Sequence, residues 1–146
     1  MTYHYAYDAE IKAFRIRFEG RVDMEEILRS DQEIIHEPEW AASRRILTHL
    51  DIDADLSALT LQQYLKVAMP YMDATREIRG KGTREAWVIP ARWNSPIIQV
   101  WEQLPHKDEH HAFAVFDTEV EALDWLLRPG RDGEASISGA NPQSSS

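Results

Sequence analysis

Short segments with the periodicity of β-strands alternate with helical patterns along residues 1–127. In the first two of these segments, large apolar side chains recur at every second position, which is typical of the half-buried strands of a hairpin. Three later segments are short apolar runs that predict buried strands. The five predicted strands are residues 3–7, 14–18, 45–51, 87–89 and 112–116. The order β-β-α-β-α-β-α-β-α favours an α/β fold, with a single-layer mixed, mostly parallel five-stranded sheet and four helices packed against it.

Each of the four predicted helices begins with a residue pattern that caps a helix N-terminus. In a capping box, an Asp or Thr side chain accepts a hydrogen bond from a backbone N–H that has no partner within the first turn. A serine followed by proline also suits a helix start, since proline at the first helical position loses no hydrogen bond. The four signals are Asp23 with Glu26, Thr60 with Gln63, Ser95 with Pro96, and Thr118 with Glu121. Pro70 lies inside the second helix, where its missing N–H predicts a kink or a break.

The C-terminal segment, 128–146, differs in composition from the rest of the chain. Glycine, proline and serine dominate it, and Ile137 is its one large apolar side chain. Too little apolar surface is present there to offset the entropy lost on ordering. We therefore expect one folded domain over residues 1–127, followed by a disordered tail over residues 128–146.

The overall composition excludes several classes of function. Sixteen Lys and Arg side chains stand against 25 Asp and Glu, and the resulting net charge of −9 disfavours binding to nucleic acid. The absence of cysteine excludes disulfides, thiolate metal sites and cysteine nucleophiles, and it fits a reducing compartment. The sequence has no secretory leader and no apolar run long enough to span a bilayer, so we expect a cytoplasmic protein. A peripheral membrane contact and a homodimer both stay open.

Five segments of the chain carry motifs that occur together in one known family. They are residues 19–26, 38–40, 46–51, 115–119 and 121–126, which read EGRVDMEE, PEW, ILTHLD, VFDTE and EALDWL. With these motifs, residues 10–127 resemble the SpoIIAA-like branch of the STAS-fold family. The resemblance implies a small regulatory α/β domain that binds a protein partner or a small molecule, in some members within an apolar cavity beneath a movable helix. It implies no catalytic residue and no cofactor.

Other members of the wider STAS-fold family control an anti-sigma partner through a phosphorylated serine, in an Asp-Ser-x-Gly stretch at the start of a helix. The corresponding segment here, 55–60, reads DLSALT and lacks both the Asp-Ser pair and the glycine. Ser57 is the candidate phosphosite that the resemblance implies, and helix capping by Ser57 and Thr60 is the alternative role of these hydroxyls.

Apolar side chains follow one face of the second predicted helix at four-residue spacing, and three tryptophans are grouped in the next strand, loop and helix. A helix interrupted at Pro70 carries more apolar surface than one contact face buries, which predicts either a ligand cavity or plain core. The candidate ligand-binding residues are Tyr64, Ala68, Met72, Trp93, Ile97 and Trp101. We expect segment 69–82 to be a mobile cover over this apolar site, near the carboxyl ends of the strands.

Histidine and acidic side chains offer an alternative, enzymatic interpretation. His49 lies two residues from Asp51, so the two would share one face of a strand as an acid–base pair. Three histidines and two acidic residues between His106 and His111 resemble a set of metal ligands, and segment 51–55 carries aspartates at alternate positions. No nucleophile is placed beside these groups by a motif. The sequence therefore favours a non-enzymatic binding domain without metal or cofactor, and a metal-dependent or hydrolytic enzyme is the alternative.

Overall fold

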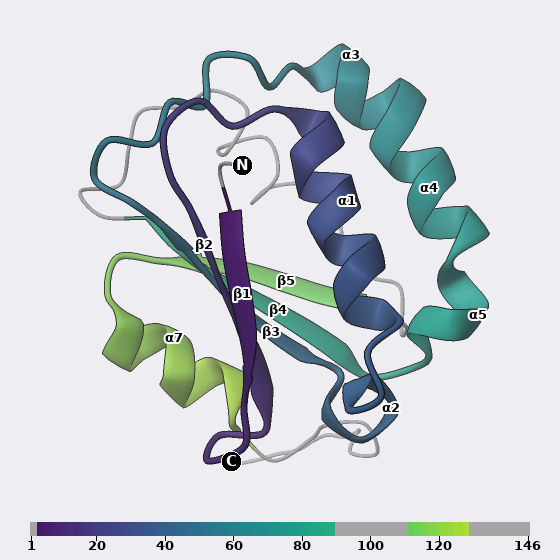
Figure 1. The fold of residues 1–146 in the computed structure, drawn as a ribbon, viewed down its shortest axis with the longest axis vertical. Coiled ribbons are helices and arrows are strands. Elements are labelled where there is room, and N and C mark those ends of the chain that lie inside the picture. The colour runs from purple at the N-terminus through teal and green to yellow at the C-terminus, as the bar shows by residue number, and fades with distance from the viewer. Residues whose placement is uncertain (1–2, 90–110, 129–146) are drawn as a thin grey trace, which may run out of the picture.

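The computed structural model describes residues 3–89 and 111–128, and it contains a five-stranded sheet flanked by helices (Figure 1). The strands are β1 (Tyr3–Asp8), β2 (Ala13–Phe18), β3 (Arg45–Leu50), β4 (Thr83–Val88) and β5 (His111–Phe116). They lie in the sheet in the same order as in the sequence, with β1 antiparallel to β2 and the other neighbours parallel. The expected α/β architecture with a mostly parallel five-stranded sheet is therefore confirmed.

Helices cover both faces of this sheet (Figure 1). One face carries α1 (Met24–Ile35), α2 (Trp40–Ser43) and a long helical segment made of α3 (Leu61–Gln63), the π-helical turn η1 (Tyr64–Ala68), α4 (Met69–Ala74) and α5 (Arg76–Arg79). The other face carries α7 (Glu119–Leu126). The connections from β2 to β3 and from β3 to β4 step in the same direction across parallel strands. Right-handed crossovers therefore place α1 and the α3–α5 segment on the same face.

Three of the four predicted helix caps are confirmed by the structure. The side chains of Asp23, Thr60 and Thr118 accept hydrogen bonds from backbone N–H groups three residues further on, at 2.9, 3.1 and 3.3 Å. Each cap satisfies an amide that the helix itself leaves without a partner. The predicted cap at Ser95 and the helix after it lie outside the described residues, as does the tail from residue 129 onward.

Of the kink or break that the sequence predicts at Pro70, the structure shows no break: helical backbone continues through the proline. Instead, η1 forms a wider turn directly before it, in which the Met69 N–H donates to the Tyr64 carbonyl five residues back. A π turn takes up the disturbance that a proline ring causes in the preceding turn. The backbone at Ala68 and Met69 accordingly keeps helical dihedral angles. The interruption comes later, at Thr75 (φ −102°, ψ 8°), between α4 and α5.

Two other features differ from the prediction: the start of β4, and the presence of two helices rather than one between β2 and β3. β4 begins at Thr83 rather than at residue 87, because the polar side chains of Arg84 and Glu85 interrupt the apolar pattern although both residues pair with β3 and β5. α1 ends at Ile35, and the separate short helix α2 then places Trp40 in the core. Both differences arise from tertiary contacts that a local pattern does not contain.

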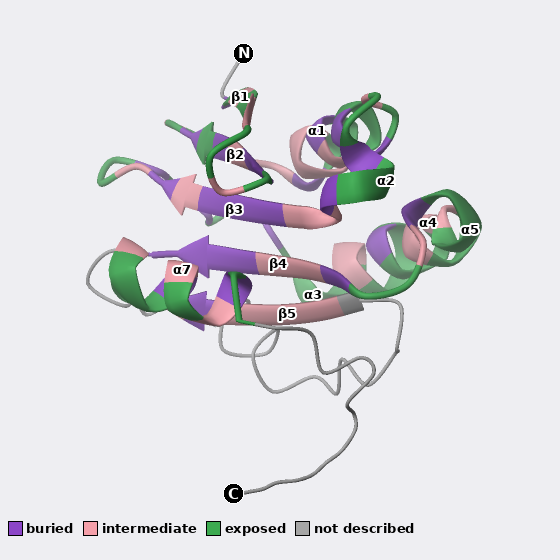
Figure 2. Cartoon of the chain, turned by 90° about the horizontal axis from the view of Figure 1, so that it is seen from below, coloured by how far each residue is buried: buried purple, intermediate pink, exposed green. Residues whose placement is uncertain are grey.

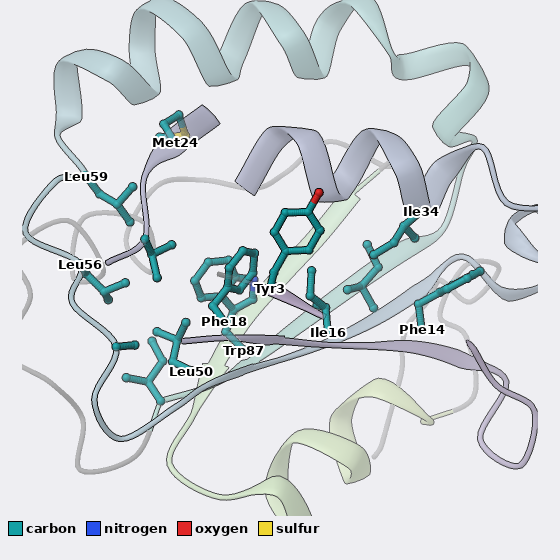
Figure 3. Close-up of a cluster of buried hydrophobic side chains, with 14 of the residues drawn as sticks. Tyr3, Phe14, Ile16, Phe18, Met24, Ile34, Leu50, Leu56, Leu59 and Trp87 are labelled. Atoms are coloured by element: carbon teal, nitrogen blue, oxygen red, sulfur yellow. The ribbon is translucent and has the colours of Figure 1, made fainter. Parts of the chain in front are cut away.

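The two faces of the sheet bury different kinds of side chains. Towards α1, aromatic and large aliphatic residues such as Phe18, Ile34 and Trp87 form the larger core (Figure 3). Towards α7, the smaller core consists of Ala13, Leu47, Ala86, Val88, Ala122 and Leu126. Figure 2 shows β3 and β4 largely buried between these layers. The large side chains of the first face also border a cavity.

Candidate functional site

A cavity of about 110 Å³ lies between the sheet and the helical elements α1, η1 and α4. Strands β2 to β5 provide one wall, and the helices provide the other. The described apolar lining residues are Ile16, Phe18, Met24, Ile27, Leu28, Ile34, Ile46, Tyr64, Ala68, Met72, Trp87 and Phe113. The described polar lining residues are Ser30, Asp31, Thr48 and Glu85. The site is thus an apolar space with a small polar part.

Three of the six predicted ligand-binding residues line this cavity together. Tyr64 and Ala68 belong to η1 and Met72 belongs to α4, as their spacing on one helix face predicted. The other three, Trp93, Ile97 and Trp101, lie outside the described residues. The described lining comes from one face of the sheet and from the helices above it, including the predicted Pro70 helix. None of it comes from segment 51–60 at the carboxyl ends of the strands, and the other segment predicted at that edge, 90–95, lies outside the described residues. A binding role for these residues stays a prediction.

Glu85 is a candidate functional residue that the sequence reasoning missed. It lies on β4 two residues before Trp87, so both side chains point to the cavity face of the sheet. The indole N–H of Trp87 donates to Glu85 Oε2 at 2.7 Å. Extending the predicted strand back to Thr83 would have placed Glu85 on the buried face, so the two-residue period is the signal that could have found it.

Burial sets the protonation of Glu85. The carboxyl is surrounded by protein atoms, and the surface that the residue keeps borders the cavity. Burial, and after it the negative charge of Asp31, raises the pKa of Glu85 to about 7. The Trp87 hydrogen bond and the positive charge of Arg79 oppose this shift without cancelling it. Near neutral pH, the carboxyl therefore exists in both protonation states.

A buried ion pair beside the cavity connects α1 to α5. Arg79 is 1% exposed, and its two terminal nitrogens donate to the Asp31 carboxylate at 3.0 and 2.6 Å. The Tyr71 hydroxyl donates to the same carboxylate at 2.6 Å. The Trp40 indole N–H donates to the Arg79 carbonyl at 3.1 Å. These contacts anchor both α4, through Tyr71, and α5, through Arg79, so segment 69–82, the predicted mobile cover, is held to α1 and α2 in this structure.

His49 lies on the opposite face of the sheet from the cavity. Its Nε2 is 2.8 Å from Glu119 Oε1 at the start of α7, and Arg15 approaches the other Glu119 oxygen at 3.4 Å. Asp51 forms its ion pair with Arg17, at 2.8 Å. Burial lowers the pKa of His49, and the neighbouring Glu119 opposes this shift. The enzymatic interpretation had suggested that His49 pairs with Asp51. In the structure, His49 instead pairs with Glu119.

The other predicted sites are described in part. Within the part of the chain that the structure describes, no three or more His, Cys, Asp or Glu side chains are arranged to hold a metal ion. The predicted cluster from His106 to His111 lies outside it, apart from the backbone of His111 in β5. Ser57 is exposed, and its backbone N–H donates to Asp55 at 3.0 Å. The helix cap is Thr60 alone, and phosphorylation of Ser57 stays a prediction.

No family model, curated protein or solved structure matches this chain. The resemblance to the SpoIIAA-like branch therefore rests on the sequence motifs and on a compatible fold class. Among the helices of residues 3–89 and 111–128, none has both the length and the apolar composition needed to cross a membrane.

Proposed function

We propose that this chain is a non-enzymatic binding domain of SpoIIAA-like, regulatory type, which holds a small apolar molecule in the cavity beneath η1 and α4. The cavity is the observation that supports this proposal. Protein cores are packed closely enough that voids larger than a water molecule are rare. A space of about 110 Å³ approaches in size the roughly 150 Å³ cavity that binds benzene in an engineered protein core.

Most of the described side chains that line this space are apolar. An apolar ligand restores dispersion contacts to the side chains that line the space. Ligand binding would therefore raise the stability of the domain, which gives binding a measurable effect without catalysis.

Helical segment 61–74 is the route by which we expect a ligand to enter. Its inner side lines the cavity, whereas Leu65 and Met69 on its outer side are about half exposed. The Arg79 ion pair fixes α5, and the interruption at Thr75 separates α5 from α4. We therefore expect η1 and α4 to move about Thr75 while α5 stays in place, a movement that must break the hydrogen bond from the Tyr71 hydroxyl on α4 to Asp31.

An enzyme that uses His49 has less support than a binding domain. The partner of His49 is Glu119 on α7, and the sheet separates this pair from the cavity. An acid–base group acts only within hydrogen-bond reach of the proton that it transfers. A ligand in the cavity would not meet that condition.

Filling the cavity with a side chain tests the proposed function. Ala68 is buried and lines the space, so Ala68→Leu occupies volume that a ligand would take. We expect calorimetry to show that wild-type protein binds benzyl alcohol and that Ala68→Leu weakens this binding at least ~10-fold. The control is Ala41→Leu, which is exposed on α2 and should leave binding unchanged. The proposal fails if wild-type protein binds no neutral apolar probe of this size, or if both variants bind equally well.

A further inference from the structure

Strand β1 is the outermost strand of the described sheet, on the side of the N-terminal hairpin (Figure 2). Of the described strands, only β2 pairs with it, so the N–H and C=O groups of every second β1 residue point away from the sheet. Proteins commonly protect such an edge with proline, lysine or a β-bulge. The sequence of β1, YHYAYD, contains no proline or lysine, and its residues pair with β2 in continuous register. His4 and Ala6 are exposed, so another chain can reach this edge.

Helix α1 places two carboxylates beside the β1 edge. The Tyr3 hydroxyl donates to Glu33 at 3.0 Å. The Tyr5 hydroxyl donates to Glu37 at 2.6 Å. Two residues along a strand span about 6.7 Å and four residues along a helix span about 6 Å, so the two spacings match. A strand added to β1 would therefore carry alternate side chains past Glu33 and Glu37 at this spacing.

The charge beside the edge indicates which kind of strand can pair there. Glu33 is exposed and Glu37 is half-buried, and each carboxylate can accept hydrogen bonds besides the one from tyrosine. Arg29, one turn before Glu33, forms its ion pair with Glu25, at 3.2 Å. A second copy of this chain, paired through its own β1 with both α1 helices on one side of the sheet, would bring two further carboxylates to the same place. Like charges repel there, whereas lysine or arginine at alternate positions would be attracted.

We propose that β1 is a docking edge for an extended basic segment of a partner protein, which pairs with β1 through backbone hydrogen bonds and places Lys or Arg side chains at alternate positions against Glu33 and Glu37. In complexes of this kind, the backbone pairing gives affinity and the alternate side chains give specificity. Neither glutamate is among the described residues that line the cavity, so docking at β1 does not depend on the proposed ligand site.

A short synthetic peptide of alternating threonine and lysine is the probe for this edge. NMR titration of the wild-type protein at physiological salt should show that the peptide binds and that the backbone amide signals of β1 shift most. A peptide of the same composition with its lysines grouped at one end keeps the charge but loses the alternation, and it should bind at least ~3-fold more weakly. The alternating peptide with all its backbone amides methylated cannot donate to β1, and it should not bind. Nor should an alternating peptide of threonine and glutamate.

Glu33→Gln combined with Glu37→Gln tests the two carboxylates. Glutamine keeps an oxygen that can accept from each tyrosine but removes both charges, so the alternating lysine peptide should bind ~3-fold or more weakly. The control is Asp73→Asn combined with Glu77→Gln, which makes the same change of charge at exposed positions on α4 and α5. It should leave the affinity of the peptide unchanged.

Several results would contradict docking at β1. The proposal is wrong if the peptide does not shift the β1 amide signals, or if the grouped or methylated peptide binds as tightly as the alternating one. Equal loss of affinity in the two double variants would also overturn it, because net charge alone would then explain the binding. If the wild-type protein alone sediments as a dimer whose β1 amides are protected from hydrogen exchange, a second copy occupies the edge and the proposed partner is wrong.

Discussion

The two faces of the sheet are packed with side chains of different size. On the α7 face, Ala13, Ala86 and Ala122 are fully buried between the strands and the helix. On the opposite face, the large rings of Phe18 and Trp87 lie beneath the helices, and a cavity is left beside them. Small side chains allow a helix to approach a sheet closely, whereas large rings that meet at an angle leave space between them. On the α7 face the large rings, Phe116 and Trp125, are only partly buried, so the two faces differ in the size of their fully buried side chains.

The largest expected effect concerns the buried charge on the cavity face. Asp31→Ala leaves the Arg79 guanidinium buried without its partner, so the free energy of unfolding should fall by about 3–5 kcal/mol. Urea denaturation measures this loss. The control is Asp73→Ala, which removes an exposed ion pair with Arg76 and should cost less than about 1 kcal/mol. Similar losses in the two variants would show that Arg79 does not anchor α5.

The next largest effect, a change of about 3 kcal/mol in the free energy of unfolding, comes from the protonation of Glu85. Because its pKa is raised from 4.5 to about 7, the folded state holds the proton more tightly than the unfolded state does. The stability contributed by this group is complete below pH 4.5 and is lost as the pH rises to about 7. Glutamine does not ionise, so the stability of Glu85→Gln relative to wild type should rise by about 3 kcal/mol between pH 4.5 and pH 8. Denaturation curves across this pH range measure the difference, and a constant difference would contradict the burial of the carboxyl.

The smallest expected change in stability comes from a direct comparison of the two faces, with one substitution on each. Ala122→Leu adds a larger side chain to the closely packed α7 face and should destabilise the protein by about 1–3 kcal/mol. Ala68→Leu adds the same side chain beside the cavity. The free energy of unfolding of this variant should therefore be within about 1 kcal/mol of the wild-type value, or higher. Thermal denaturation of both variants checks this order. A greater loss for Ala68→Leu would mean that the cavity does not accept the added atoms.

The features that the sequence predicted well depend on residues close together in the chain. Asp23, Thr60 and Thr118 cap helices through amides three residues away, so the pattern itself contains the interaction. The alternation of strand and helix periods likewise led to the mostly parallel sheet. Tyr64 and Met72 reached the cavity because a shared helix face is a local property.

The features that were missed depend on distant contacts or on irregular backbone. Asp31 and Arg79 are 48 residues apart, and their pairing becomes visible only when α1 and α5 pack together. The π turn before Pro70 adds a residue to one helical turn, which a regular period does not anticipate. Glu85 interrupts an apolar pattern, so the strand was predicted to begin after it and its place in the cavity was lost.

The order of the strands has a consequence for how the chain folds during synthesis. Because the spatial order β1 to β5 repeats the order of translation, each new strand is added at the edge formed by the strand before it. None of the five described strands has to enter between two that are already paired. A nascent chain can therefore extend its sheet from the N-terminal hairpin as it leaves the ribosome. Until β4 emerges, β3 presents an open, apolar edge, and this is the stage at which the chain most needs protection from aggregation.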